Sequence, residues 1–345
     1  MSFPKLTPRQ VFEAADRLPR ARLAHLPTPL EEAPRFAERI GGRVRVFVKR
    51  DDATGLLLGG NKARHNEFLL GDAVAQGCDV VVWGAGVQSN NCRQTAAGCA
   101  KLGLECRLFL SLGNSSTEPR GNLLLDYLVG AKVEFTDAPL GPDLDALLAA
   151  KADELRREGR NPYYWHRPRV VPLAAVSYAV CVAEIAEQLA ERGLTAAGLY
   201  VSSSGATGAG VALGKALLGL DAAARLICPM TWPWDIPTAI AADANDAARM
   251  PGLPHRLTAA DVDADESFIP PGYGKPSFAG REALRLMATS EAILTDPVYS
   301  AKALAGLIAD VRAGRYPDGS VLVFIHTGGV PAIFADPASV LDVTP

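Results

Sequence analysis

A lysine that directly follows two glycines and an asparagine is the residue in this sequence best suited to covalent chemistry. The segment GGNK places Lys62 after Gly59, Gly60 and Asn61, at the start of a helical pattern. Paired glycines let the backbone approach a flat ligand closely, and desolvation in a pocket keeps a lysine amine neutral for imine formation. The alternative is a solvated lysine after a turn, so the neighbouring motifs must decide between the two interpretations.

A second motif consists of the amide and hydroxyl residues Gln88, Ser89 and Asn90. It follows an apolar run at 79–86 and precedes a stretch with helical spacing at 91–103. The carboxyl end of a parallel strand and the amino end of a helix together offer N–H groups to an anion such as a substrate carboxylate. Ordinary capping of the helix by serine or asparagine is the alternative interpretation.

A third motif, SSSGATGAGVALG at 202–214, leads from an apolar run into a helical pattern. Such a loop can hold a phosphate through its N–H groups and hydroxyls. It matches neither the nucleoside-triphosphate loop G-x-x-x-x-G-K-[ST] nor the dinucleotide motif G-x-G-x-x-G, so a monophosphate is the better fit. The donors expected here are Ser203, Ser204, Gly205, Ala206, Thr207 and Gly208.

The elements that must position these motifs alternate along the chain, which predicts an α/β protein with parallel sheet. Strands are expected in the mostly apolar runs at 43–50, 79–86, 105–112, 198–205, 225–230 and 320–329. Helices are expected at 62–76, 91–103, 120–129, 143–158, 179–192, 208–218 and 299–313. The Pro- and Asp-rich stretch at 231–275 is expected to be an irregular excursion.

Composition excludes several classes of protein. The 345 residues carry 35 basic and 38 acidic side chains, a net charge of −3, so nucleic-acid and membrane-surface partners are not expected. Six cysteines lie in apolar stretches without a C-x-x-C pair and are interpreted as reduced core residues, and the five histidines lack metal-ligand spacing, so no metal is predicted. No signal-peptide pattern or membrane span is evident, which predicts a cytoplasmic location.

Six segments, in this order over nearly the whole chain, resemble the D-cysteine desulfhydrase and 1-aminocyclopropane-1-carboxylate (ACC) deaminase family of fold-type II pyridoxal-phosphate (PLP) enzymes, within the tryptophan synthase β superfamily. They are HLPTPLEEAPRF at 25–36, VKRDDATGLLLGGNK at 48–62, GVQSNNCRQTAA at 86–97, GYGKPS at 272–277, ILTDPVYSAKALAGL at 293–307 and VFIHTGGVPAIF at 323–334. The resemblance implies a homodimer of two-lobed subunits, with a smaller lobe at about 55–170 and a larger lobe formed by 1–54 plus 171–345.

The resemblance also implies roles for single residues. Lys62 would carry PLP as a Schiff base, and Gln88, Ser89 and Asn90 would lie beside the substrate carboxylate. Tyr273 and Tyr299 match the two tyrosines that face the substrate in the family. A phenol there can hydrogen-bond a leaving group, or relay a proton if its pKa is lowered. The further residues expected around the cofactor are Asn61 beside Lys62, the 203–208 loop, and Ser300 or Thr327 near the pyridine nitrogen.

Ser300 helps to choose between the activities of the family. ACC deaminases have glutamate at this place after DPVY, and a carboxylate there keeps the pyridine nitrogen protonated and strengthens the electron sink. A serine hydroxyl cannot supply that charge. The resemblance together with this departure predicts α,β-elimination from a small amino acid, as in D-cysteine desulfhydrase, which yields a keto acid and ammonia. ACC deamination, β-replacement, racemisation and a catalytically silent binding protein remain the alternatives.

Two segments depart from the family. The family has a Gly-Gly-Ser segment where this chain reads YYWHRPRVVPLAAVSY at 163–178, with a helix expected from near Tyr178. If the bulky and basic side chains there line the pocket, an anionic substrate such as cysteate is predicted, since arginine binds such groups in bidentate fashion. A solvated basic loop is the alternative. The segment CPMTWPWDIP at 228–237 is also unlike the family and is expected to shape a different site.

Overall fold

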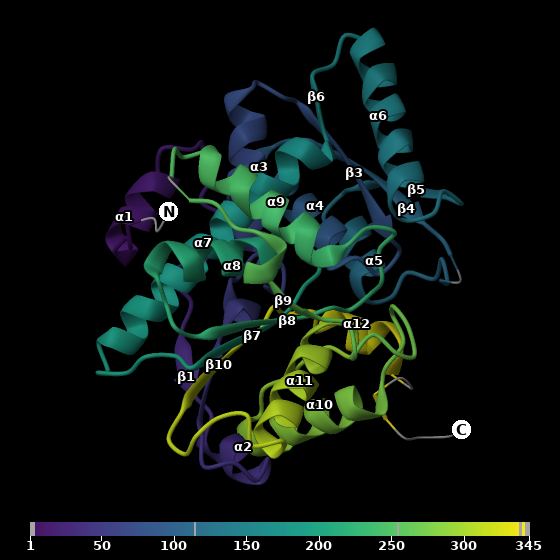
Figure 1. Ribbon diagram of the computed structural model, residues 1–345. Coiled ribbons are helices and arrows are strands. Elements are labelled where there is room, and N and C mark those ends of the chain that lie inside the picture. The colour runs from purple at the N-terminus through teal and green to yellow at the C-terminus, as the bar shows by residue number, and fades with distance from the viewer. Residues whose placement is uncertain (1–3, 114, 254, 338–339, 342–345) are drawn as a thin grey trace.

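Two mainly parallel sheets, each covered by helices, form the computed structural model (Figure 1). The structure describes residues 4–113, 115–253, 255–337 and 340–341. This is the α/β architecture that the alternation of apolar runs and helical patterns predicts.

The smaller sheet has four parallel strands, in the order β5-β4-β3-β6. These strands are β3 (Val80–Gly86), β4 (Glu105–Ser111), β5 (Lys132–Thr136) and β6 (Pro162–Tyr164). The helices of this part of the chain are α3 (Asn61–Ala75), α4 (Asn90–Leu102), α5 (Gly121–Leu128) and α6 (Pro142–Arg157).

The larger sheet has six strands, in the order β1-β2-β10-β7-β8-β9, and only the β1–β2 pair is antiparallel. Its strands are β1 (Leu30–Glu32), β2 (Arg45–Lys49), β7 (Gly198–Ser202), β8 (Ala223–Ile227), β9 (Asp263–Asp265) and β10 (Val321–Ile325). The accompanying helices are α1 (Pro8–Ala15), α2 (Pro34–Arg39), α7 (Arg167–Ala190), α8 (Ala206–Leu218), α9 (Ile236–Arg249), α10 (Phe278–Glu291), α11 (Ser300–Arg312) and α12 (Pro331–Ala335).

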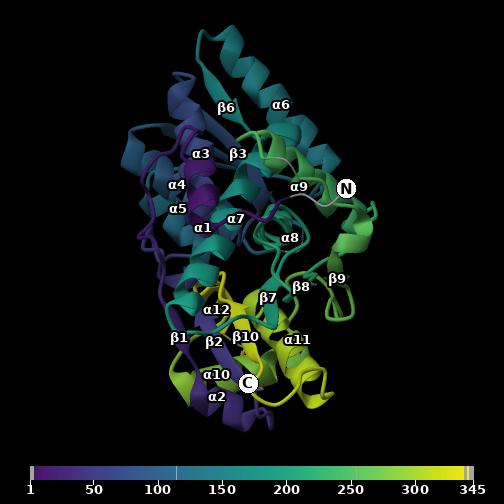
Figure 2. The same cartoon turned by 60° about the vertical axis from the view of Figure 1, so that its left-hand side comes forward.

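Helices cover both faces of the larger sheet, with α7 and α8 on one face and α10 and α11 on the other (Figure 2). All five residues of β7 and of β10 are accordingly buried. This is the environment that near-continuous apolar runs indicate, because neither face of such a strand meets water. The six cysteines are all free and buried, as the sequence predicts.

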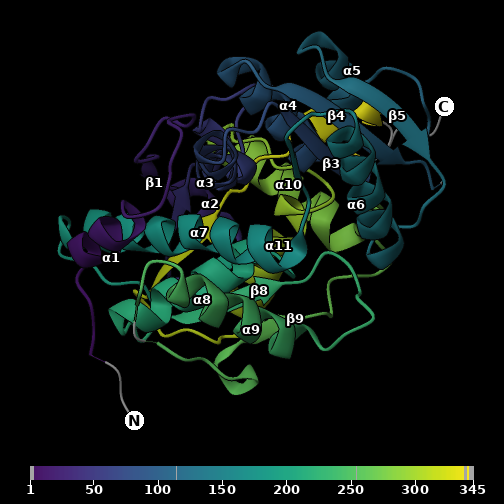
Figure 3. The same ribbon diagram turned by 90° about the horizontal axis from the view of Figure 1, so that it is seen from above.

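Helix α7 is the central helix of the protein, and it packs against α3 on one side and against α8 and α9 on the other (Figure 3). It begins at Arg167, twelve residues before the expected start at 179. Pro168 is tolerated in the first turn, where its missing N–H costs no hydrogen bond, and Pro172 lies inside the helix. The helix is long and apolar enough to cross a membrane, but 89% of its most apolar stretch is buried within the protein, as in a core helix.

The stretch at 231–275 is more regular than predicted, because it contains the fourteen-residue helix α9. Asp235 caps this helix by accepting a hydrogen bond from Thr238 N at 2.9 Å, and Pro237 fits its first turn. The Pro and Asp residues that indicated an irregular segment are therefore helix-start signals. The remainder, which holds the three-residue strand β9, is mostly irregular.

The chain order of the two sheets is what places the functional motifs together. All strands of the smaller sheet lie between residues 80 and 164, whereas the larger sheet takes β1 and β2 from before this range and four strands from after it. The loops that follow β3, β7 and β10 at their carboxyl ends open into one cavity. The predicted lobes, 55–170 and the rest, have this same chain order, and their boundaries stay a prediction.

Candidate active site

The cavity between the two sheets has a volume of about 270 Å³ and brings together most of the residues that the sequence motifs single out. Residues of all three motifs and both predicted tyrosines line it, namely Asn61, Lys62, Ser89, Asn90, Ser203, Ser204, Gly205, Ala206, Thr207, Tyr273, Tyr299 and Thr327. Three predicted residues do not line it, and these are Gln88, Gly208 and Ser300. Ligand sites at the carboxyl ends of parallel strands are the general rule for α/β proteins.

Lys62 is the second residue of α3 and its side chain enters the cavity. Burial lowers the pKa of its amine from the ordinary 10.5 to about 8, and no acidic group contributes to this shift. A lysine without a carboxylate partner loses its proton easily, because desolvation disfavours the ammonium form. The amine is therefore prepared to attack a carbonyl carbon.

The glycines before Lys62 serve chain packing rather than contact with a ligand. Gly59 and Gly60 have φ values of +64° and +125°, which side chains rarely adopt. A β-carbon on Gly59 would overlap the carbonyl oxygen of Asp52, and one on Gly328 would lie 2.7 Å from Gly60 Cα. The close approach that the sequence indicates is thus between two backbone segments, and it fixes the turn from which α3 starts.

The 203–208 loop presents donors to the cavity. Helix α8 begins at Ala206, and its N-cap residue Gly205 provides no side-chain cap, so helix-start N–H groups are left for a ligand. Ser203 Oγ accepts hydrogen bonds from Gly205 N at 3.2 Å and Gly208 N at 2.9 Å, which shapes the loop from within. The buried hydroxyl of Ser202 has no hydrogen-bond partner. This arrangement is a cradle for an oxyanion such as a phosphate.

His65 also lines the cavity, and the sequence interpretation did not single it out. Its Nε2 lies 3.1 Å from Thr207 Oγ1, which also accepts a hydrogen bond from Asn61 Nδ2 at 3.0 Å. Burial, together with the charges of Lys62 and Arg64, lowers the pKa of the imidazole well below its usual range, so the ring is neutral. Its place one helical turn after Lys62 is the sequence signal that could have found it.

The second motif caps a helix and reaches the cavity, while its binding of a substrate carboxylate stays a prediction. Ser89 caps α4, since its Oγ accepts hydrogen bonds from Asn91 N at 3.1 Å and Cys92 N at 3.2 Å, and it also lines the cavity. Gln88 turns the other way, because its side chain bonds Asn122 N at 2.9 Å and the carbonyl of Arg120 at 3.0 Å. Gln88 therefore holds the start of α5 in this structure instead of facing a substrate.

The two predicted tyrosines meet at the cavity wall. The hydroxyls of Tyr273 and Tyr299 are hydrogen-bonded to each other, and the rings make an edge-to-face contact with centroids 5.9 Å apart. Burial raises the pKa of Tyr299 well above its usual range and raises that of Tyr273 as well. The condition for a proton relay, a lowered pKa, is thus not met, and both phenols stay protonated as hydrogen-bond donors.

Thr327 and Ser300, the two candidates for the pyridine nitrogen, differ in position. Thr327 lines the cavity, whereas Ser300 is fully buried and hydrogen-bonds the carboxylate of Asp296. Asp296 also lines the cavity, and its carboxylate accepts hydrogen bonds from Val298 N at 2.9 Å, Tyr299 N at 2.9 Å and Ser300 N at 2.8 Å. The Asp296 carboxylate therefore caps the start of α11. The sequence interpretation missed it.

Both segments that depart from the family reach the cavity. Trp165 and Arg167 from the first, and Pro229, Met230, Trp232 and Trp234 from the second, are among the lining residues. His166 and Arg169, by contrast, are exposed. Arg169 Nε pairs with Asp72 Oδ2 at 2.8 Å, away from the cavity. The basic segment is therefore divided, with one arginine at the cavity and one on the surface.

These features fit PLP. A lysine amine with a lowered pKa faces the same cavity as an uncapped helix start with an unpartnered serine hydroxyl, which matches the aldehyde and phosphate of this cofactor. No cluster of three or more metal-ligating side chains occurs in the described part of the chain. His326 is buried and its Nε2 contacts Leu294 O at 2.8 Å, which is a structural hydrogen bond.

Comparisons with known proteins show which family the chain is similar to. A model of the family "Pyridoxal-phosphate dependent enzyme" matches residues 21–328. D-cysteine desulfhydrases of Salmonella choleraesuis (strain SC-B67) and Salmonella schwarzengrund (strain CVM19633) are each 37% identical over 330 residues, covering 92% of this chain and 96% of theirs.

Solved structures give the same assignment. The crystal structure of an ACC deaminase homologue has a TM-score of 0.87 and 32% identity, with 96% of this chain and 98% of that chain covered. O-ureido-L-serine synthase, at 16% identity and a TM-score of 0.66 with 96% of each chain covered, shares the fold. With PLP as its cofactor, this chain belongs to the D-cysteine desulfhydrase and ACC deaminase family of fold-type II pyridoxal-phosphate dependent enzymes.

Proposed function

We propose that the protein catalyses α,β-elimination from a small amino acid, with release of a keto acid and ammonia. The observation that carries this proposal is the Lys62 amine, whose pKa is lowered to about 8 and which shares a cavity with Ser89 and the uncapped start of α8. The D-cysteine desulfhydrase relatives and the ACC deaminase homologue support an ammonia-releasing reaction.

PLP, when bound, supplies the electron sink that makes the α-proton of an amino acid acidic. In the proposal, Lys62 holds the cofactor aldehyde and accepts the α-proton of the substrate. The 203–207 loop holds the phosphate, with Asn61 and His65 fixing the hydroxyl of Thr207. Ser89 and Asn90, at the start of α4, bind the substrate carboxylate through the donors that helix capping leaves over, the Ser89 hydroxyl proton and the Asn90 side-chain amide.

Tyr273 and Tyr299 are assigned to the leaving group. Because both phenols stay protonated, they donate a hydrogen bond or a proton to the atom that departs from Cβ. For cysteine, the Cβ–S bond breaks and sulfur leaves with the electron pair. Addition of one water then gives pyruvate, ammonia and hydrogen sulfide.

We assign Thr327 as the hydrogen-bond partner of the pyridine nitrogen, since Thr327 lines the cavity and Ser300 does not. The Asp296 carboxylate already accepts hydrogen bonds from three backbone N–H groups and from Ser300. It is therefore poorly placed to hold a proton on the ring nitrogen as well. A neutral partner makes a weaker sink, which is adequate for expelling a good leaving group and favours elimination over opening of a cyclopropane.

The proposal is tested by adding D- and L-cysteine, cysteate, serine and ACC to the holoenzyme, while keto acid, ammonia and the cofactor absorbance are followed. Pyruvate and ammonia released from a β-substituted amino acid are expected. Lys62→Ala should abolish turnover and the visible band of the holoenzyme, whereas Lys101→Ala, an exposed lysine on α4, serves as the matched control.

Each alternative predicts a different product. ACC deamination gives 2-oxobutyrate, racemisation releases no ammonia, and β-replacement yields a new amino acid when an added nucleophile is present. A catalytically silent binding protein would bind PLP without any amino acid changing its spectrum. A Lys62→Ala variant that keeps full turnover would overturn the proposal.

We also propose a homodimer, which exposed apolar side chains on two packed helices support. Leu128 on α5 is 71% exposed and Phe334 on α12 is 63% exposed, and the two helices pack against each other. Large exposed apolar residues gathered in one place mark association surfaces. Light scattering after gel filtration should give a dimer for the wild type and a monomer for Leu128→Asp. The matched control Val74→Asp, at an exposed position on α3, should remain dimeric.

A further inference from the structure

We infer that the tryptophans of the two divergent segments form a second compartment of the cavity, which binds a planar, uncharged group on the substrate. If the proposed elimination holds, on which this inference rests, the substrate is an amino acid that carries an aromatic thioether on Cβ. The residues that define the compartment, called the tryptophan compartment below, are Leu140, Leu144, Trp165, Arg167, Met230, Trp232 and Trp234.

The compartment is built from both parts of the fold. Trp165 follows β6, in which Tyr164 lies beside Val82 of β3, the strand that leads to the Ser89 loop. Its backbone N–H bonds Val82 O at 3.2 Å, and its ring stands edge-on to Trp83 with centroids 5.0 Å apart. The first tryptophan is therefore fixed next to the strand whose end carries the proposed carboxylate site.

Trp232 and Trp234, from the second divergent segment, also line the cavity. Their rings are stacked on each other, with centroids 4.8 Å apart and planes inclined by 10°, so each ring covers one face of the other and the two form a single rigid aromatic unit. Trp232 Nε1 donates to Ser204 Oγ at 2.9 Å, which ties this pair to the proposed phosphate loop. A β-carbon on Gly141, at the start of α6, would lie 3.8 Å from the Trp232 ring. The compartment thus spans the distance from the Ser89 side to the phosphate side.

Charge in the compartment opposes an anionic ligand. The guanidinium of Arg167 lies 5.0 Å from the centroid of the Trp234 ring, and its Nη2 is 3.3 Å from Asp243 Oδ2. The cation already has a carboxylate partner and an aromatic face. Asp145 also lines the cavity and would repel a sulfonate, phosphate or second carboxylate. The anionic substrate that the basic sequence indicates is therefore disfavoured by these two aspartates.

An uncharged planar group suits the remaining walls. Leu140, Leu144 and Met230 are apolar, and tryptophan faces attract aromatic rings in stacked or edge-on arrangements. The indole N–H of Trp234 is buried without a hydrogen-bond partner, so this ring is held by packing rather than by a polar contact. A methyl-sized or thiol side chain would leave these surfaces unfilled, which costs dispersion contacts.

The chemistry of elimination selects the atom that links this group to Cβ. Arenethiols are more acidic than alkanethiols, so an aryl thiolate is a good leaving group for a weak electron sink. From S-phenylcysteine the Cβ–S bond breaks, and sulfur departs with the electron pair and takes up one proton. With one water the balanced products are benzenethiol, pyruvate and ammonia, so no oxidant or reductant is needed.

The test compares four amino acids in both enantiomers with the holoenzyme, and the measured quantity is kcat/KM for pyruvate release. The four are cysteine, S-phenylcysteine, cysteate and S-(2-aminoethyl)cysteine, which differ in size and in the charge of the side chain. We expect kcat/KM for S-phenylcysteine to exceed that for each of the others by about tenfold or more, the effect of filling an apolar pocket. Preference for cysteate or for the cationic analogue would overturn the inference.

Single substitutions test whether the tryptophan compartment causes the preference for S-phenylcysteine. Trp234→Leu should lower the ratio of kcat/KM for S-phenylcysteine to that for cysteine by about tenfold. Phe135→Leu, which removes an aromatic ring from β5 outside the cavity lining, is the matched control and should leave the ratio unchanged. An equal ratio in wild type and Trp234→Leu would show that the compartment does not contact the side chain.

A binding measurement separates this inference from the proposed reaction. Phenylalanine has the aromatic ring but no leaving group, so its inhibition or spectral binding constant reports the compartment alone. Tighter binding of phenylalanine than of alanine, reduced in Trp234→Leu, supports the compartment even if no amino acid undergoes elimination. Equal binding of phenylalanine and alanine overturns it, even if cysteine is eliminated.

Discussion

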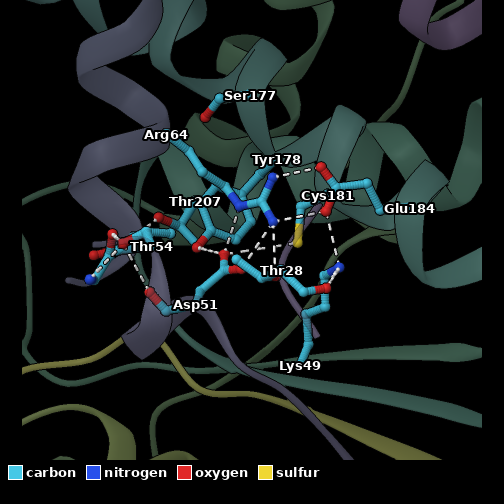
Figure 4. Close-up of polar contacts among 12 residues, drawn as sticks. Thr28, Lys49, Asp51, Thr54, Arg64, Ser177, Tyr178, Cys181, Glu184 and Thr207 are labelled. Atoms are coloured by element: carbon cyan, nitrogen blue, oxygen red, sulfur yellow. Dashed lines mark hydrogen bonds and ion pairs between the residues drawn. The ribbon is translucent and has the colours of Figure 1, made fainter. Parts of the chain in front are cut away.

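The guanidinium of Arg64 makes a two-point ion pair with the carboxylate of Asp51, with Nε–Oδ2 at 2.8 Å and Nη2–Oδ1 at 2.9 Å. Arg64 also bonds both carboxylate oxygens of Glu184 on α7, at 2.8 and 2.7 Å, and Lys49 Nζ contacts the same carboxylate at 2.8 Å (Figure 4). Two buried cations therefore face two buried anions. Because Arg64 lies two residues after Lys62, this network holds the start of α3 against α7.

Arg64→Met should destabilise the protein by about 3–5 kcal/mol, because it leaves buried carboxylates without their partner. The free energy of urea unfolding measures the loss. Arg43→Met is the matched control, since Arg43 pairs with Asp318 at an exposed site and its removal should cost less than about 1 kcal/mol. Similar losses in the two variants would contradict the structural role given to Arg64.

The lowered pKa of Lys62 predicts how the apoenzyme combines with PLP. Only the neutral amine reacts, and with a pKa of about 8 its fraction rises about tenfold between pH 7 and pH 9 and then levels off. The rate of growth of the visible absorbance band should follow this curve. Nα-acetyl-lysine, with an ordinary pKa, serves as the control and should still be accelerating at pH 9. A rate for the protein that keeps rising to pH 10 would contradict burial of the amine.

Asp243 should make the use of anionic substrates depend on pH. Burial raises the pKa of its carboxyl to about 6, against the opposing effect of Arg167. Below pH 6 the carboxyl is protonated and neutral, so Arg167 is freed for an anion, whereas above pH 6 the ion pair forms. KM for cysteate should therefore fall by about threefold to tenfold from pH 7.5 to pH 5.5, the range of a single partly exposed charge pair.

Asp243→Asn removes the competing charge at every pH. Its KM for cysteate should be low at both pH values, while KM for the uncharged S-phenylcysteine should depend little on pH in either protein. The ratio of the two KM values corrects for titration of the substrate amine and of Lys62. A wild-type pH profile that persists in Asp243→Asn would exclude this aspartate as its cause.

A pair of substitutions distinguishes the role of Ser300 from that of Thr327. Ser300→Ala removes hydrogen bonds within the buried Asp296 cluster and should cost about 1–3 kcal/mol of unfolding free energy, with the cofactor absorbance maximum unchanged. Thr327→Val keeps the shape of the side chain but removes the hydroxyl from the cavity. It should shift the absorbance maximum and weaken PLP binding. The opposite pattern would assign the pyridine nitrogen to Ser300.

Some features were readable from the sequence because they depend on neighbouring residues in the chain. The apolar runs predict β7 and β10, since strands buried on both faces need apolar side chains at every position. GGNK predicts a helix that begins at the lysine, and SSSGATG predicts a loop that leads into a helix. The order of these motifs also carries the family resemblance, which implied the cofactor.

The start of α7 was misplaced because local signals there have two meanings. Pro168 and Pro172 indicate a break when only the chain is considered, yet one lies in the first helical turn and the other is inside the helix. Burial of the apolar residues that follow Pro168, from Val170 onward, favours the helix over the turn. The Pro- and Asp-rich start of α9 misled in the same way.

What the sequence by itself determined is therefore the type of fold and the cofactor, and it singled out Lys62 as the lysine proposed to carry it. The tertiary structure alone decided that Gln88 faces α5, that burial keeps Tyr299 protonated, and that tryptophans from two remote segments line one cavity. The physical reason is the distance along the chain over which each kind of interaction acts. Backbone conformation and patterning act over a few residues, whereas desolvation, side-chain orientation and the pairing of Arg167 with Asp243 depend on residues brought together only by packing.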